Sequence, residues 1–113
     1  MTHYLLNIIQ PDGPTPPSAE LEAIMQRMTA LDRELHDAGV WVYNGGLTPP
    51  DQATVTRVQD GGTTVSPGAF GDAEVHVGGF WIIDVPSVSA AQEWAARASE
   101  ASTLPIEVRA ILR

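Results

Sequence analysis

Apolar positions along this chain change their spacing several times, and each change marks a different secondary-structure element. The stretch Gly78–Val85 joins two glycines to aromatic and β-branched residues, which is the composition of a fully buried strand. Tyr4–Ile9 is largely apolar on both of its alternating faces, which is typical of a strand in the middle of a sheet. The pattern therefore predicts two strands that are buried on both sides.

Two other stretches carry the three- and four-residue apolar spacing of amphipathic helices. The first begins near Ser18, a good N-cap residue, and ends at Gly39, which we expect in the left-handed conformation that terminates helices. The second runs from about Ser89 to Ala101, and Ser89 has the capping-box spacing to Gln92. Its alanine-rich apolar face predicts close packing on the sheet.

The remaining strands are shorter and are separated by turn residues. Val40–Tyr43, Thr54–Gln59 and Leu104–Leu112 are predicted as strands, and in the last of them Ile106, Val108 and Ala110 alternate with Glu107 and Arg109. Thr63–Val65 forms a brief return strand after the hairpin turn at Asp60–Gly62. The element order predicts an α+β domain of the ferredoxin-like βαββαβ kind. In this fold two helices cover one face of an antiparallel sheet.

Composition limits the size of the protein and the partners it can bind. The chain has 113 residues, 43% of them hydrophobic, so we expect one domain over residues 1–113 that gains further burial by forming a homodimer. The net charge is −8, and the six basic residues are scattered arginines: Arg27, Arg33, Arg57, Arg97, Arg109 and Arg113. A nucleic acid is therefore not an expected partner.

Several other classes of protein are also unsupported. The chain contains no cysteine, which excludes thiolate zinc sites and thiol nucleophiles. No basic, apolar leader is present at the start and no apolar run is long enough to cross a bilayer, so we expect a cytoplasmic protein without membrane attachment. Phosphate-binding loops, nucleophile elbows and dinucleotide fingerprints are missing, and we expect neither a cofactor nor a metal.

A candidate binding surface follows from the alternation of the strands. We expect the helices to cover the face that carries Tyr4, Leu6, Ile8, Val40, Val42, Ile106 and Val108. The opposite face then carries a mixture of polar and aromatic candidates for substrate binding: Asn7, Trp41, Tyr43, Arg57, Glu107 and Arg109. A dimer would enclose this surface as an apolar pocket with a few polar groups. Alternatively, Glu107 and Arg109 form ion pairs at a hydrated subunit interface and do not bind a substrate.

Three residues are candidates for acid–base catalysis. His76 lies near Asp72 and Glu74, and a histidine beside carboxylates is suited to act as a general base near neutral pH. The same residues are alternatively metal ligands or a solvated strand end. His3 is predicted on the open face, although an N-terminal histidine is also commonly frayed. We take His76, Asp72 and His3 as the catalytic candidates.

The chain resembles a known family over nearly its whole length. The resemblance rests on the order and spacing of short segments: Glu34-Leu35, Ala38-Gly39-Val40, Gly46-Leu47-Thr48-Pro49, Thr56-Arg57-Val58, Asp60-Gly61, Gly79–Val85, Glu93-Trp94-Ala95 and Ile106–Arg109. With these segments the chain resembles the YCII-related proteins, and within them the branch that carries a DGPF motif. The resemblance implies a homodimeric α/β barrel in which two ferredoxin-like sheets face each other across their helix-free sides.

The chain departs from this family at two places that bear on catalysis. The loop that reads Val-Thr-Asp-Gly-Pro-Phe-Ala-Glu in the DGPF branch reads Val-Ser-Pro-Gly-Ala-Phe-Gly-Asp at residues 65–72. Met28 stands where the narrower, enzyme-like branch has a histidine in the first helix. The resemblance therefore implies a retained scaffold with altered candidate acid–base groups.

Two functions remain open from the sequence. Some relatives act as small-molecule lyases or dehalogenating enzymes, so the first function is a homodimer that binds a small apolar or aromatic molecule, with lyase- or isomerase-like acid–base activity. The second is a non-enzymatic regulatory or accessory protein that binds a protein partner through its acidic surface, since DGPF proteins often accompany extracytoplasmic-function sigma factors. A stable protein partner without a bound ligand in native mass spectrometry would favour the second.

Overall fold

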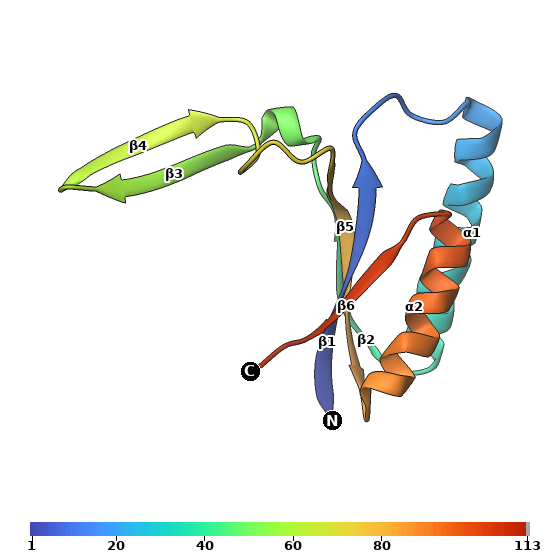
Figure 1. Ribbon diagram of the computed structural model, residues 1–113. Coiled ribbons are helices and arrows are strands. Elements are labelled where there is room, and N and C mark those ends of the chain that lie inside the picture. The colour runs from blue at the N-terminus through green and yellow to red at the C-terminus, as the bar shows by residue number, and fades with distance from the viewer. Residues whose placement is uncertain (113) are drawn as a thin grey trace.

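A four-stranded antiparallel sheet, ordered β2-β5-β1-β6, forms the centre of the fold in the computed structural model (Figure 1). The structure describes residues 1–112, and Arg113 lies outside them. The elements follow the order β1 (Thr2–Pro11), α1 (Ser18–Asp37), β2 (Trp41–Gly46), a 3₁₀ turn η1 (Pro50–Gln52), β3 (Thr54–Gln59), β4 (Gly62–Pro67), β5 (Val75–Val85), α2 (Val88–Ser102) and β6 (Ile106–Ala110). The α+β class predicted from the sequence is confirmed.

The two strands predicted to be buried lie in the middle of this sheet. β1 and β5 pair antiparallel from Thr2 opposite Val85 to Pro11 opposite Val75. β2 and β6 occupy the two edges, paired with β5 and β1 respectively. The arrangement is consistent with the ferredoxin-like fold, in which each helix connects two strands of the same sheet.

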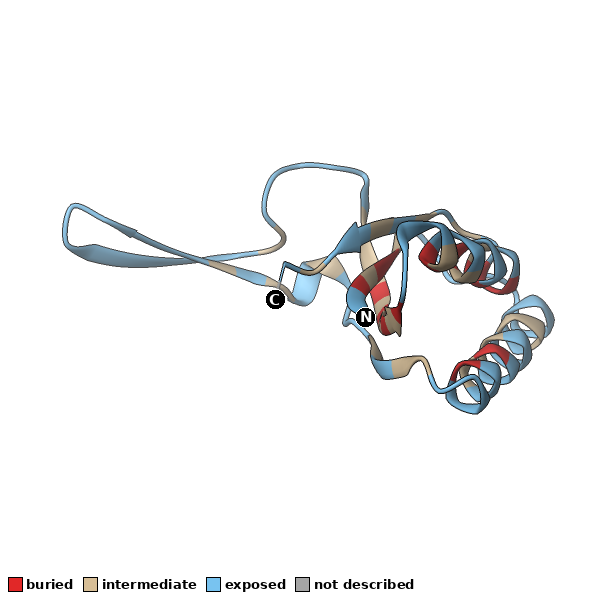
Figure 2. Cartoon of the chain, turned by 90° about the horizontal axis from the view of Figure 1, so that it is seen from below, coloured by how far each residue is buried: buried red, intermediate tan, exposed pale blue. Residues whose placement is uncertain are grey.

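Both helices lie on one side of the sheet, and the core fills the space between them and the strands (Figures 1 and 2). The core joins large residues of the strands and two leucines of α1 to small residues of α2: Tyr4, Leu6, Leu31, Leu35, Trp81, Ile83, Val85, Ala91, Ala95, Ala98 and Ala101. Trp81 spans this core, and its indole Nε1 donates a hydrogen bond to Asp32 Oδ1 of α1 at 2.9 Å. The alanines of α2 let that helix approach the sheet closely, as their spacing predicted.

The ends of the helices differ slightly from the sequence prediction. Pro17 occupies the N-cap position of α1, and Ser18 is already helical. Ser87 caps α2, because its hydroxyl accepts a hydrogen bond from the Ala90 amide at 3.2 Å, so the capping box predicted at Ser89 does not form the helix start. Gly39 follows α1 with φ +73°, which confirms the predicted left-handed termination.

Replacing Gly39 with alanine should lower the free energy of unfolding by about 1 kcal/mol. No atom of the described residues lies within 4 Å of the position that a Cβ would take, so the cost comes from the left-handed backbone that L-residues disfavour. Urea denaturation of Gly39→Ala against the wild type measures this difference. An unchanged midpoint would show that the chain after α1 relaxes out of the left-handed conformation at no cost.

The strands β3 and β4 form a separate two-stranded sheet that projects from the body, and we call residues Thr54–Pro67 the arm (Figures 1 and 2). Asp60 and Gly61 turn the chain at its tip with φ values of +50° and +76°, the conformation of the predicted hairpin turn. A hydrogen bond from the Gly68 amide to the Ala53 carbonyl, 2.7 Å long, closes the base of the arm.

No helix among the described residues is long and apolar enough to span a membrane.

Candidate functional site

A β-bulge at Gly78 determines which side of the sheet His76 occupies. Ile8 pairs with Gly79 and Ile9 pairs with Val77, so Gly78 is the extra residue of β5. An extra residue reverses the alternation of the strand beyond it. His76 therefore lies on the same side as its neighbour Gln10 and as Ile8, which packs against the core on the side of the sheet that carries the helices.

Position 78 must be a glycine also because the side chain of Gln10 lies across it. A Cβ at this position would collide with Gln10 Oε1 and would lie 3.0 Å from Gln10 Cβ and Cδ. The glycine thus leaves room for the amide of Gln10 beside the bulge. The bulge and this close approach together form the floor of the site.

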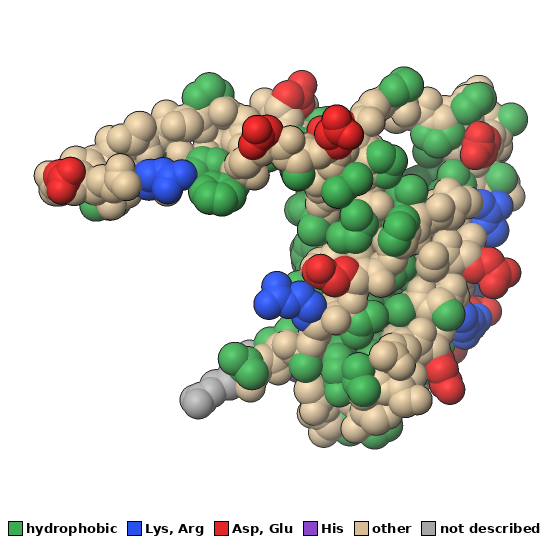
Figure 3. Space-filling model, viewed as in Figure 1, with side chains coloured by type: hydrophobic (Ala, Val, Ile, Leu, Met, Phe, Trp, Pro, Cys, Tyr) green, Lys and Arg blue, Asp and Glu red, His purple; other side chains and the backbone are tan. Residues whose placement is uncertain are grey.

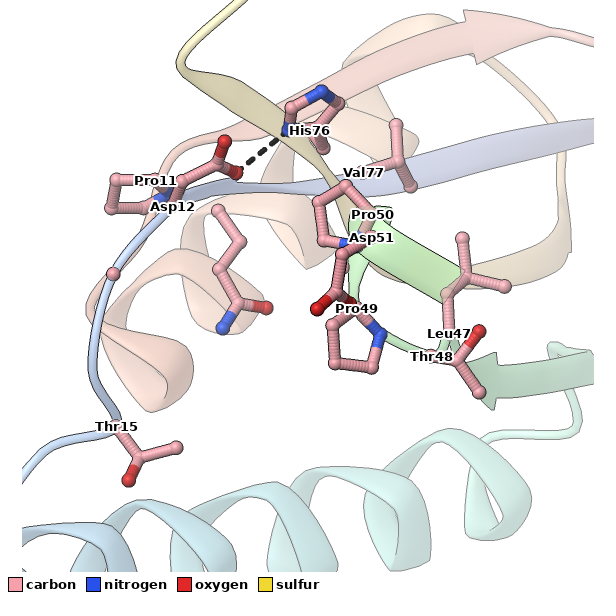
Figure 4. A pocket seen from close by; sticks show the side chains of 13 residues that line it. Pro11, Asp12, Thr15, Leu47, Thr48, Pro49, Pro50, Asp51, His76 and Val77 are labelled. Carbon is pink, nitrogen blue, oxygen red and sulfur yellow. Dashed lines mark hydrogen bonds and ion pairs between the residues drawn. The ribbon is translucent and has the colours of Figure 1, made fainter. Parts of the chain in front are cut away.

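His76 forms a hydrogen-bonded pair with Asp12, the first residue after β1. The Asp12 amide donates to the Glu74 carbonyl at 2.9 Å, which extends the pairing of β1 and β5 and brings the carboxylate next to the imidazole. His76 Nδ1 lies 2.7 Å from Asp12 Oδ1, and 21% of the histidine side chain is exposed (Figure 4). The carboxylate can only accept, so Nδ1 carries the hydrogen and Nε2 is left to exchange a proton with a ligand.

A cavity of about 410 Å³ adjoins this pair, between the ends of β1 and β5, the chain before α1 and the residues around η1 (Figure 4). Its apolar walls come from Pro11, Leu47, Pro49, Pro50 and Val77. Its polar side chains are those of Gln10, Asp12, Thr15, Thr48, Asp51 and His76. The volume and the mixture of apolar walls with a few polar groups are those of small-molecule sites.

The charges in this cavity restrict the kind of ligand it can hold. Asp12 and Asp51 line it, and in the part of the chain that the structure describes neither lysine nor arginine is among the lining residues. An anion would meet two carboxylates without a compensating cation, which is unfavourable at short range. The cavity therefore suits a neutral or cationic molecule.

The structure separates the three residues predicted to be catalytic. His76 lines the cavity, but its partner is Asp12, whereas Asp72 lies in the loop before β5 and forms no hydrogen bond or ion pair with His76 within residues 1–112. His3 lies opposite Asp84, at the other end of the β1–β5 pairing. The sequence analysis missed Asp12 because it is 64 positions from His76, and only the register of β1 against β5 brings the two together.

Four of the six residues predicted to bind substrate lie on the face of the sheet opposite the helices. By their cross-strand pairing, the central residues of this helix-free face are Leu5, Asn7, Tyr43, Phe80, Ile82, Glu107 and Arg109. Asn7 Nδ2 donates to Glu107 Oε1 at 3.2 Å, and the rings of Tyr43 and Phe80 lie 6.1 Å apart. None of these residues lines the cavity beside His76.

The predicted positions of the other two, Trp41 and Arg57, are wrong. A bulge in β2 between Trp41 and Tyr43 places Trp41 on the helix side, where its ring stacks on His36 with centroids 4.3 Å apart. The same irregularity leaves Val42 exposed instead of covered by the helices. Arg57 lies on the arm, because β3 pairs with β4 and not with the main sheet, and its guanidinium lies 5.4 Å from the Phe70 ring centroid.

The described residues contain no group of three or more histidine, aspartate or glutamate side chains arranged to hold a metal ion. Among the candidates, Asp72, Glu74 and His76 therefore do not form a ligand set in the part of the chain that the structure describes. The chemistry available in the cavity is that of the His76–Asp12 pair together with hydrogen-bonding groups such as Gln10 and Thr48.

A comparison with protein families agrees with the resemblance noted in the sequence. The sequence model of the YCII-related domain matches residues 1–113. No curated protein matches the chain at a significant level.

Proposed function

This chain belongs to the YCII-related family, and we propose that it binds a small neutral or cationic molecule beside His76 and acts on it by acid–base catalysis. The observation that carries the proposal is the His76–Asp12 pair, 2.7 Å between Nδ1 and Oδ1, at the wall of a cavity of about 410 Å³. The reaction class that suits such a pair is a lyase- or isomerase-like proton transfer.

In the proposed reaction His76 is the residue that moves the proton. Asp12 holds the imidazole by its Nδ1 hydrogen, so Nε2 removes a proton from the substrate and becomes an imidazolium ion. The proton then returns to another atom of the same molecule in an isomerisation, or to the leaving group in an elimination. Asp12 stabilises the imidazolium in between without itself being protonated.

The other lining residues determine how the substrate is held. The hydroxyl of Thr48 and the amide of Gln10 supply hydrogen-bond donors for an oxygen atom of the substrate. Pro49, Pro50 and Val77 offer apolar surface for an aliphatic or aromatic body. A substrate with both features matches the small apolar or aromatic class expected from the sequence.

We also propose that the protein works as a homodimer whose helix-free faces meet, as in a dimeric α/β barrel. The support is the composition of this face, on which Leu5, Phe80 and Ile82 form an apolar centre without helices to cover it. Asn7, Glu107 and Arg109 border that centre and would be enclosed with it. Membership of the DGPF branch, and a sigma-factor-linked accessory role as the alternative function, remain predictions from the sequence.

Ligand binding at the cavity can be tested before the substrate is known. We expect small neutral and cationic aromatic fragments to shift the backbone amide NMR signals of Asp12, Thr48 and Val77, because these residues line the cavity. Thr48→Trp should fill the cavity and abolish the shifts. His36→Gln, which changes a histidine outside the cavity, should preserve them.

A reacting molecule then tests the catalytic proposal. His76→Gln should lower kcat/KM by about 10²- to 10⁴-fold, the usual contribution of a general acid–base residue, and Asp12→Asn should lower it less. Fragments that shift only amides on the helix-free face would contradict the site. Unchanged turnover in His76→Gln would contradict the mechanism.

A further inference from the structure

Few contacts with the rest of its own subunit stabilise the arm. Within residues 1–112, β3 pairs only with β4, and of the strand residues in the arm only Val55 is partly buried. A two-stranded hairpin without a third strand or a helix against it is at best marginally stable in water. The arm therefore needs a surface to pack on that the single chain does not supply.

The arm and its base carry a cluster suited to packing against another molecule. Val58 and Val65 are exposed on the strands, and Phe70, just after β4, is 72% exposed. Arg57 lies over the Phe70 ring, 5.4 Å from its centroid. Aromatic residues and arginines are the side chains that most often carry the energy of protein interfaces. Figure 3 shows hydrophobic and basic side chains on the side of the arm that faces the hollow beside the sheet.

The size of the exposed surface agrees with an uncovered interface. A compact monomer of 12.1 kDa exposes about 6,000 Å², whereas this chain exposes 7743 Å². Its radius of gyration is 16.2 Å, against about 13 Å for a compact domain of this length. The excess, roughly 1,700 Å², exceeds the ~800 Å² that each partner buries in a stable interface.

The shape of the chain favours a second copy as the molecule that covers this surface. The arm and the helix-free face border the same hollow, so one body placed there meets both (Figures 1 and 3). A two-fold axis lets the sheet of each copy face the other while each arm crosses the other copy. Each strand of the arm has six residues and therefore extends about 20 Å. Packed sheets lie ~10 Å apart, so an arm of this length spans the space between the two sheets and is long enough to cross the partner's sheet.

The distribution of charged residues also favours a second copy of this chain as the partner of the arm. Arg57 is the one basic residue of the arm in a protein with net charge −8. The helix-free side carries the carboxylates of Glu107 and Asp84 beside Arg109, and within residues 1–112 Asp84 Oδ1 is buried without a hydrogen-bond partner. The arm thus brings a further cation to a side of the sheet that carries two carboxylates.

We propose that the arm is an intersubunit clamp, in which Phe70 and Arg57 of each copy pack against the sheet of the other. This inference rests on the homodimer proposed above and adds that the dimer depends on the arm.

Sedimentation equilibrium with two matched variants tests the clamp. Phe70→Ser should raise the dimer dissociation constant by about 30-fold or more, as expected when a central aromatic contact is removed from an interface. Met25→Gln changes a side chain of α1 that is 59% exposed on the helix side, and it should leave the constant unchanged. Circular dichroism reports whether each variant keeps its fold.

Hydrogen exchange of the wild-type arm supplies a second measurement that needs no variant. The amides of β3 and β4 should be protected in the dimer and should lose this protection on dilution to monomer, while those of β5 stay protected. A wild-type dimer with an unchanged dissociation constant in Phe70→Ser and unprotected arm amides would overturn the clamp alone. A wild-type chain that stays monomeric at every concentration would overturn the dimer and the clamp, whereas fragment binding beside His76 is measured independently.

Discussion

Replacing Trp81 with alanine is expected to lower the free energy of unfolding by about 3–5 kcal/mol, the usual cost of removing a buried tryptophan. Only 2% of Trp81 is exposed, and it lies in β5 between the helices and the centre of the sheet. Its removal leaves a cavity in a core that is built largely from alanines on the side of α2. The free energy of unfolding of a small domain is only about 5–15 kcal/mol in total, so much of the stability of this protein depends on Trp81.

The variant Trp81→Phe separates the packing of the ring from its hydrogen bond. Phenylalanine keeps most of the apolar contacts but cannot donate to Asp32 Oδ1, which accepts the indole hydrogen at 2.9 Å. We expect Trp81→Phe to lower the free energy of unfolding by about 1–2 kcal/mol, which is close to the value of a single hydrogen bond to a charged group and smaller than the loss in Trp81→Ala. Urea denaturation of both variants gives the two values, and a loss in Trp81→Ala no larger than in Trp81→Phe would contradict the packing argument.

Replacing Gly79 with valine is expected to destabilise the protein by about 2–3 kcal/mol, through crowding in the middle of the sheet. A Cβ on Gly79 would lie 3.1 Å from the Gly45 carbonyl oxygen and 3.3 Å from Ile8 Cδ1. The carbonyl belongs to the neighbouring strand β2, so relief requires the backbone itself to move. The branched side chain of valine adds further atoms to the same space.

Gly46 provides the matched control for this substitution. It is the direct cross-strand partner of Gly79 in the β2–β5 pairing, yet no atom of residues 1–112 lies within 4 Å of its Cβ position. Gly46→Val should change the free energy of unfolding by less than about 0.5 kcal/mol, as surface substitutions usually do. Equal losses in the two variants would mean that strand propensity, not crowding at Gly79, determines the effect.

The proposals for the cavity and for the arm depend on different residues and can fail separately. The cavity needs His76, Asp12 and the glycine at position 78, all of which belong to one chain. The clamp needs Phe70 and Arg57, which touch each other but no part of the cavity. A monomeric protein that binds fragments would retain the first proposal, and a dimer that binds none would retain the second.

The sequence by itself determined the elements of this protein, because their signals are local. Apolar spacing located both helices and the two central strands, Gly39 marked the end of α1, and Asp60–Gly61 marked the hairpin turn. These signals arise from periodicity and from backbone conformations that few residues tolerate. The ferredoxin-like order of elements followed from them directly.

Only the tertiary structure decided which side chains meet. One extra residue at Gly78 reverses the alternation of β5 and places His76 with Asp12, and a second irregularity in β2 moves Trp41 to the helix side. Sequence patterns locate strands but do not reveal a bulge or a register, and a shift of one residue exchanges the two faces of a strand. The same holds for β3 and β4, whose alternation predicts strands equally well inside the sheet or on an arm outside it. The pairing of the strands therefore decided the composition of the candidate site.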